Sequence, residues 1–133
     1  MILELYNKLV DITQHGKQPK TTLLFTHEHL VNKLASYLGL FEHFPLHGFD
    51  EDDNLCLPME RNWFSAFVMP FNANFAAALY RCGKEYKLFT MFNEIPVKIK
   101  GCSSELCDLN EFFESYKTLA DTCNLDHICP GKI

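Results

Sequence analysis

The sequence predicts an α/β fold in which helices flank a parallel sheet. Three observations support this class. Apolar residues recur at intervals of three and four over residues 2–13, a short apolar run follows at residues 22–26, and a second helical repeat covers residues 30–38. A run without polar alternation is typical of a strand that is buried on both faces of a parallel sheet. Helix, buried strand and helix in this order form an α/β unit.

The boundaries of these elements follow from glycines and from a change in composition. Gly16 stands where the first helix should stop, and Gly39 is suited to cap the second helix. Residues 42–62 are irregular and contain the acidic run 50–53. This run lacks the spacing of a calcium-binding loop, so we expect a solvated loop rather than a cation site.

The second half of the chain predicts a β-rich region followed by a helix. Residues 63–70 and 73–82 are rich in aromatic and aliphatic side chains, and residues 86–92 and 95–99 flank Asn93 and Glu94 in the manner of a β-hairpin. Asp108 and Glu111 have the spacing of a helix capping box. An apolar stripe follows them and is expected to contact the core; it consists of Leu109, Phe112, Phe113, Tyr116, Leu119 and Ala120.

Length and composition exclude several classes of protein. The chain has 133 residues, which suits one domain, and 47% of them are hydrophobic, which excludes a disordered chain. Its 12 basic and 17 acidic residues give a net charge of -5, so we expect no nucleic-acid partner. Glu4 and Lys8 interrupt the apolar start, which is therefore neither a signal peptide nor a membrane span.

The six cysteines point to disulfides and an oxidising compartment, because the count is even and high for so short a chain. The start of the chain has no signal peptide, so either the cysteines are reduced or the chain is the tail of a longer secreted protein. Their spacing with His127 matches no known zinc pattern, so we expect no metal. The six are Cys56, Cys82, Cys102, Cys107, Cys123 and Cys129.

His27, Glu28 and His29 are the residues that suggest chemistry. They directly follow the predicted strand, and ligands of α/β folds bind beyond the carboxyl ends of strands. Two histidines and a carboxylate suit acid-base work, phosphate binding or metal binding. A metal pair of His27 and His29 lacks further ligands at recognisable positions. A solvated strand end without any function is the other interpretation.

Residues 23–30, followed by residues 38–41, resemble the second catalytic segment of the two-motif histidine phosphatases. The nearest branch is multiple inositol polyphosphate phosphatase, whose pattern is an apolar strand, Gly-His-Ala-Glu, an apolar helix and Leu-x-Gly-x-Phe. Further matches follow in the same order, so that the resemblance extends from about residue 23 to residue 129. They lie at residues 68–74, 79–82, 92–97, 101–102 and 106–113.

The resemblance implies the carboxy-terminal portion of a histidine phosphatase fold, with residues 1–133 as a single partial domain. It implies hydrolysis of inositol polyphosphates through a phosphohistidine intermediate, without a cofactor. The nucleophile of the family lies in an Arg-His-Gly-x-Arg-x-Pro segment, which these residues lack; residues 14–19 imitate it without either arginine, which we interpret as coincidence. We therefore expect this chain alone to be inactive. A non-catalytic module that binds anions or a protein partner is the alternative.

The resemblance also suggests roles for individual residues. His27 matches the second histidine of the family, which contacts the transferring phosphoryl group. Glu28 occupies the place of the acid in the acid phosphatase and phytase branches, and His29 that of the acid in the inositol phosphatase branch. Glu28 is therefore the first choice of proton donor and His29 the second, unless the donor has been lost.

The resemblance extends to the cysteines and to the compartment. Cys82 and Cys102 flank the predicted hairpin, and Cys123 and Cys129 would close a small loop as late cysteine pairs do in secreted members. A secreted or endoplasmic reticulum location is implied.

Overall fold

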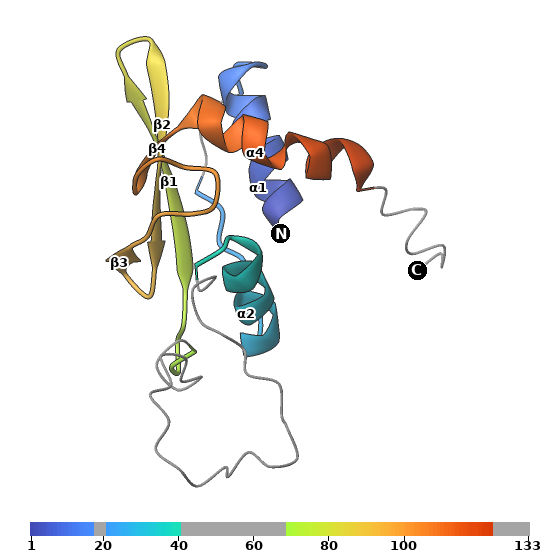
Figure 1. Cartoon of the computed structure of the whole chain (residues 1–133), viewed down its shortest axis with the longest axis vertical. Helices are drawn as coiled ribbons and strands as arrows, with labels where there is room; N and C mark the ends of the chain where they lie inside the picture. The colour runs from blue at the N-terminus through green and yellow to red at the C-terminus, as the bar shows by residue number, and fades with distance from the viewer. Residues whose placement is uncertain (18–20, 41–68, 124–133) are drawn as a thin grey trace, which may run out of the picture.

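The computed structural model describes residues 1–17, 21–40 and 69–123. Within these ranges the chain forms three helices and a four-stranded antiparallel sheet, and the helices lie on one side of the sheet (Figure 1). The fold is therefore a mixed one of helices and strands. In chain order the elements are α1 (Ile2–Thr13), α2 (Glu28–Tyr37), β1 (Phe75–Cys82), β2 (Glu85–Phe92), β3 (Ile95–Pro96), β4 (Leu106–Asp108) and α4 (Leu109–Thr122).

Strand β2 is the centre of the sheet. It pairs with β1 along its whole length, from Glu85 opposite Cys82 to Phe92 opposite Phe75. Strands β3 and β4 share its other edge. The prediction of a parallel sheet is wrong, because β1 and β2 are joined by a two-residue turn and such a turn can connect only antiparallel strands.

The hairpin predicted around Asn93 and Glu94 is present between β2 and β3. Both turn residues have positive φ angles, 49° and 66°, as a type I′ turn requires. The Asn93 side-chain oxygen accepts a hydrogen bond from the backbone N–H of Asn74 at 3.0 Å, which ties the turn to the start of β1. Strand β3 is shorter than predicted, because its pairing with β2 ends at Pro96.

The predicted buried strand at residues 22–26 is also absent. Residues 21–27 belong to no described helix or strand, and all of them are exposed. The exposed fractions are 72% for Leu23, 54% for Leu24 and 93% for Phe25. The strands that the structure describes come later in the chain and pair with one another, and none of them pairs with this segment.

The three predicted helices are present. Helix α1 covers residues 2–13 as expected, and Gly39, with a φ of 69°, follows the end of α2. At the start of α4, the Asp108 carboxylate accepts a hydrogen bond from the Asn110 backbone N–H at 2.9 Å. The other half of the predicted capping box differs, because the Glu111 carboxylate accepts hydrogen bonds from Ser103 instead.

The core lies between β2 and the helices. Leu88, Thr90 and Phe92 alternate along one face of β2 and are buried. Helix α4 carries the predicted apolar stripe, and three members of the stripe are buried: Leu109, Phe112 and Tyr116. The ring of Phe112 is fully buried, 4.7 Å from that of Tyr116 and 6.3 Å from that of Tyr6 in α1. The stripe therefore contacts the core, as predicted for these positions.

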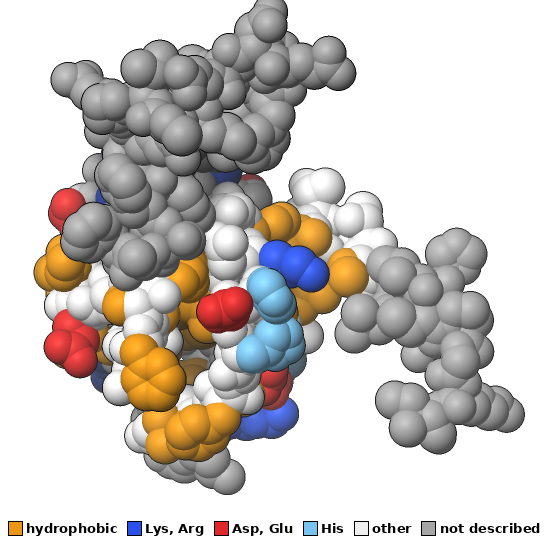
Figure 2. All heavy atoms as spheres, turned by 90° about the horizontal axis from the view of Figure 1, so that it is seen from below, with side chains coloured by type: hydrophobic (Ala, Val, Ile, Leu, Met, Phe, Trp, Pro, Cys, Tyr) orange, Lys and Arg blue, Asp and Glu red, His pale blue; other side chains and the backbone are white. Residues whose placement is uncertain are grey.

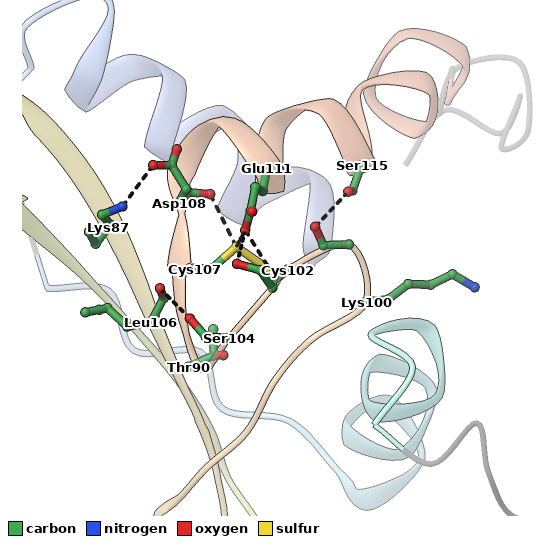
Figure 3. The surroundings of a disulfide bond; sticks show 12 residues. Lys87, Thr90, Lys100, Cys102, Ser104, Leu106, Cys107, Asp108, Glu111 and Ser115 are labelled. Carbon is green, nitrogen blue, oxygen red and sulfur yellow. Dashed lines mark hydrogen bonds and ion pairs between the residues drawn. A yellow bond between two sulfur atoms is a disulfide. The ribbon is translucent and has the colours of Figure 1, made fainter.

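A disulfide joins Cys102 to Cys107 next to this core (Figure 3). Both cysteines are buried, and the intervening loop is held by the Glu111 carboxylate, which accepts hydrogen bonds from the N–H and hydroxyl of Ser103. Cys82 is an exposed free cysteine, and the loop implied for Cys123 and Cys129 includes a residue outside the described ones. Cys56, Cys129 and the acidic run 50–53 lie outside the described residues.

An ion pair joins β2 to the start of α4. Lys87 Nζ lies 3.0 Å from Asp108 Oδ2 (Figure 3). The Lys87 ammonium and the Asn110 backbone N–H lower the pKa of the Asp108 carboxyl, and the hydrogen bond to Asp108 raises the pKa of Lys87. The stabilisation from this pair is thus lost as pH falls through the lowered pKa of Asp108 or rises through the raised pKa of Lys87.

Gly101 precedes the disulfide and has a φ of 84°, and a Cβ added there would overlap the Ser115 side chain of α4. We expect Gly101→Ala to lower the free energy of unfolding by about 2–4 kcal/mol, from backbone strain and overpacking together. Gly83→Ala is the matched control, because Gly83 has a similar φ of 68° but open space around it. It should cost only about 1 kcal/mol. Urea unfolding measures both, and equal losses would contradict this packing.

Replacing Cys102 and Cys107 by alanine together removes the cross-link. We expect the free energy of unfolding to fall by about 2 kcal/mol, because the unfolded chain gains the freedom of a short opened loop. The control is Cys82→Ala, which removes an exposed free thiol and should leave stability unchanged. Thermal unfolding under non-reducing conditions measures both changes. A double variant as stable as the control would show that the disulfide does not stabilise the fold.

Candidate functional site

His27, Glu28 and His29 lie at the N-terminus of α2. His27 is the N-cap residue, with extended backbone angles, and Glu28 is the first residue of the helix. The His27 side chain makes no capping hydrogen bond. The three residues therefore lie at the start of a helix rather than at the end of a strand, and the His27 imidazole does not cap that helix.

The three side chains form a solvated cluster. The rings of His27 and His29 lie edge to face, with centroids 5.8 Å apart. Glu28 Oε1 lies 3.9 Å from His29 Nε2, and both side chains are more than 70% exposed. Figure 2 shows a face on which histidine side chains lie at the surface beside acidic and basic ones. Water therefore competes for every hydrogen bond that these groups can make.

Contacts at the far end of α2 fix the position of the cluster. Leu34, Ala35 and Leu38 are buried. The Leu38 carbonyl accepts a hydrogen bond from the backbone N–H of Lys100 at 2.7 Å, and the Lys100 carbonyl accepts one from the Tyr116 hydroxyl at 3.2 Å. The C-terminal end of the helix is thereby tied to α4, whereas its N-terminal end extends into solvent.

The helix start favours an anion. Backbone N–H groups of the first helical turn lack intrahelical acceptors, and the helix dipole adds partial positive charge there. The Leu30 N–H donates a hydrogen bond to the His27 carbonyl at 3.1 Å, and the N–H groups of Glu28 and His29 come before it in the first turn. Imidazole N–H groups beside such donors can bind phosphoryl oxygens, and a carboxyl group can supply a proton.

His15 lies in residues 14–19, the segment that imitates the nucleophile motif without its arginines, and it makes a different contact. His15 Nδ1 lies 3.1 Å from Asp11 Oδ1, one turn earlier, and Lys17 Nζ lies 2.6 Å from Asp11 Oδ2. The Lys17 and His15 hydrogen bonds lower the pKa of the Asp11 carboxyl. His15 thus belongs to an exposed ion-pair cluster at the end of α1.

Two features near the site were missed from the sequence. Asn32, one helical turn after Glu28 and His29, has a buried side-chain oxygen without a hydrogen-bond partner. A shallow groove of about 190 Å³ also runs between α2 and the start of α1. The spacing of its α2 residues by three and four positions could have indicated the groove. It is lined by Met1, Ile2, Leu30, Lys33, Leu34 and Tyr37.

The described part of the chain contains neither a cluster of metal-ligand side chains nor a helix that could span a membrane. Within residues 1–17, 21–40 and 69–123, no three His, Cys, Asp or Glu side chains come together as metal ligands would. No described helix is both long and apolar enough to cross a bilayer.

Comparison with known proteins gives two relatives. The chain is 30% identical over 110 residues to multiple inositol polyphosphate phosphatase 1 of Drosophila melanogaster, a match that covers 76% of this chain and 24% of the relative. It is 26% identical over 119 residues to the protein of the same name from Dictyostelium discoideum, covering 84% of this chain and 18% of the relative. The chain thus spans about a quarter or less of these relatives. No family model and no solved structure matches it.

Proposed function

We propose that the chain belongs to the inositol polyphosphate phosphatases and takes part in the hydrolysis of phosphate monoesters on an inositol ring. The observation that carries this proposal is the cluster of His27, Glu28 and His29 at an exposed helix start. It occurs in a chain most of which matches two relatives with that name. In this proposal the reaction passes through a phosphohistidine, and this chain supplies the second histidine.

His27 is the phosphoryl-binding residue of the proposal. Phosphoryl transfer depends mainly on donors that stabilise charge on the equatorial oxygens of the transferring group. The His27 ring, which makes no capping hydrogen bond, and the N–H groups of the first turn of α2 are such donors. They lie on one short segment of the chain. Glu28 directly follows His27, and its ionised carboxylate repels an anion. The affinity of this site for phosphate is therefore highest when the Glu28 carboxyl is protonated.

Glu28 is the proton donor of the proposal, and His29 is the second choice. The leaving group is an inositol alkoxide, which needs a proton as the phosphorus–oxygen bond breaks. Glu28 Oε1 and His29 Nε2 lie 3.9 Å apart, and both residues directly follow His27 in the chain, so each is a candidate to protonate a leaving group bound there. Their different chemistry makes the two assignments separable by substitution.

The nucleophile is the part of the reaction that these 133 residues do not supply, because they contain no Arg-His-Gly sequence. We therefore expect the chain on its own to bind an inositol polyphosphate without turning it over. The alternative function, a non-catalytic module that binds anions or a partner, is favoured by the same absence. The buried disulfide supports a secreted or endoplasmic reticulum location for either function.

Isothermal titration of the chain with inositol hexakisphosphate tests the binding site. We expect His27→Ala to weaken binding at least tenfold, because the substitution removes the donor that faces the phosphate. His15→Ala is the matched control, since His15 is also exposed but pairs with Asp11 on α1, and binding should not change. Equal effects of the two substitutions, or no binding by the wild-type chain, would contradict the proposal.

The proton donor can be tested in a chimera in which this chain replaces the matching residues of the fly relative. We expect Glu28→Gln to slow hydrolysis of inositol hexakisphosphate about 100-fold or more. Hydrolysis of p-nitrophenyl phosphate should change much less, because its leaving group needs no proton. His29→Ala is the comparison variant. If only His29→Ala shows this dependence on the leaving group, His29 is the donor, and a folded but inactive chimera would contradict the proposal.

A further inference from the structure

Lys33 stands one helical turn after the candidate site. It follows His29 by four residues in α2, and residues four apart are neighbours on a helix surface, with Cβ atoms about 5–6 Å apart. Lys33 is exposed, and it also lines the shallow groove between α2 and the start of α1. A basic residue therefore lies next to the cluster of His27, Glu28 and His29.

The Lys33 ammonium has no anionic partner within the part of the chain that the structure describes. The lysines of the neighbouring helix α1 differ, because Lys8 pairs with Glu4 at 2.9 Å and Lys17 with Asp11 at 2.6 Å. A lysine ammonium binds phosphate as a compact point charge. Lys33 is thus a cation beside the site that can bind an anion without first leaving an ion pair.

The direction of the helix brings this cation toward the first turn. Side chains on a helix tilt toward its N-terminus, so the long Lys33 side chain covers the turn before its own backbone. The candidate anion site at His27 and the first-turn N–H groups lies in that direction. Phosphates on neighbouring carbons of an inositol ring are held close together. A first phosphate at His27 therefore places a second one toward Lys33.

We propose that Lys33 is a specificity-determining residue, which binds a second phosphate of a ligand whose first phosphate lies at His27. This inference rests on the proposed function, because it uses the same anion site. The second contact is made by a ligand that is already bound, so it raises the affinity for a polyphosphate. The affinity for a single phosphate group does not depend on it. The site thereby favours ligands with phosphates on adjacent carbons over monophosphates.

Two titrations, with inositol hexakisphosphate and with inorganic phosphate, test this selectivity through the proton NMR signal of His27 Cε1–H. We expect Lys33→Ser to weaken binding of the hexakisphosphate about threefold to tenfold, as the loss of one exposed charge contact should. Binding of inorganic phosphate should not change. Lys84→Ser is the matched control, because Lys84 is an exposed lysine in the turn between β1 and β2, and both affinities should stay as in the wild-type chain.

Moving the charge along α2 tests its position. Lys33→Ser combined with Ser36→Lys keeps the composition and net charge of the chain, and Ser36 is also exposed. The ammonium then lies about one turn farther from His27. This double variant should bind the hexakisphosphate as weakly as Lys33→Ser does. Lys33→Arg should retain most of the affinity, because it keeps the cation in place.

The outcomes separate this inference from the proposed function. Full affinity of the double variant, an equal loss for both ligands in Lys33→Ser, or a loss no larger than in the Lys84 control would overturn the role of Lys33 while the His27 site stands. If neither ligand moves the His27 signal of the wild-type chain, the proposed function fails, and the inference fails with it.

Discussion

The packing of α4 against the buried face of β2 is the contact on which the rest of the structure depends. Phe112 and Leu88 are fully buried in it, and burial of such a side chain contributes about 1.5–3 kcal/mol. The Cys102–Cys107 disulfide lies at the same contact, and Gly101 allows the loop to pass close to Ser115. The sheet and α4 thus form a framework to which the N-terminal helices attach.

The candidate site depends on this framework through one backbone position. Lys100 donates a hydrogen bond to the end of α2 and accepts one from α4, so the C-terminal half of α2 is fixed. The first turn extends away from the core and presents His27 and its neighbours to solvent. Exposed groups are screened by water and ions, which limits the affinity of this cluster for an anion. Selectivity for a multiply phosphorylated ligand would then come from several weak contacts together.

The helices were predictable because their apolar residues repeat regularly, as Phe112 and Tyr116 do in α4. The direction of the sheet was predicted wrongly as parallel, although Gly83 between two β-favourable runs was a usable signal of a tight turn. The prediction of a buried strand at residues 22–26 was wrong because periodicity alone cannot distinguish a buried strand from an exposed apolar segment. Six cysteines allow 15 pairings, so only the structure could identify Cys102 with Cys107. The cluster at His27 was predictable as a motif, but its exposure at a helix start was not.

The central claim is that the first turn of α2 binds a phosphorylated inositol through His27. Proton NMR of the imidazole Cε1–H signals, assigned by substitution, tests it most directly during titration with inositol hexakisphosphate. We expect a saturable shift of the His27 and His29 signals, while the His15 signal stays in place. If all histidine signals move together, or if only that of His15 moves, then α2 is not the binding site and the claim fails.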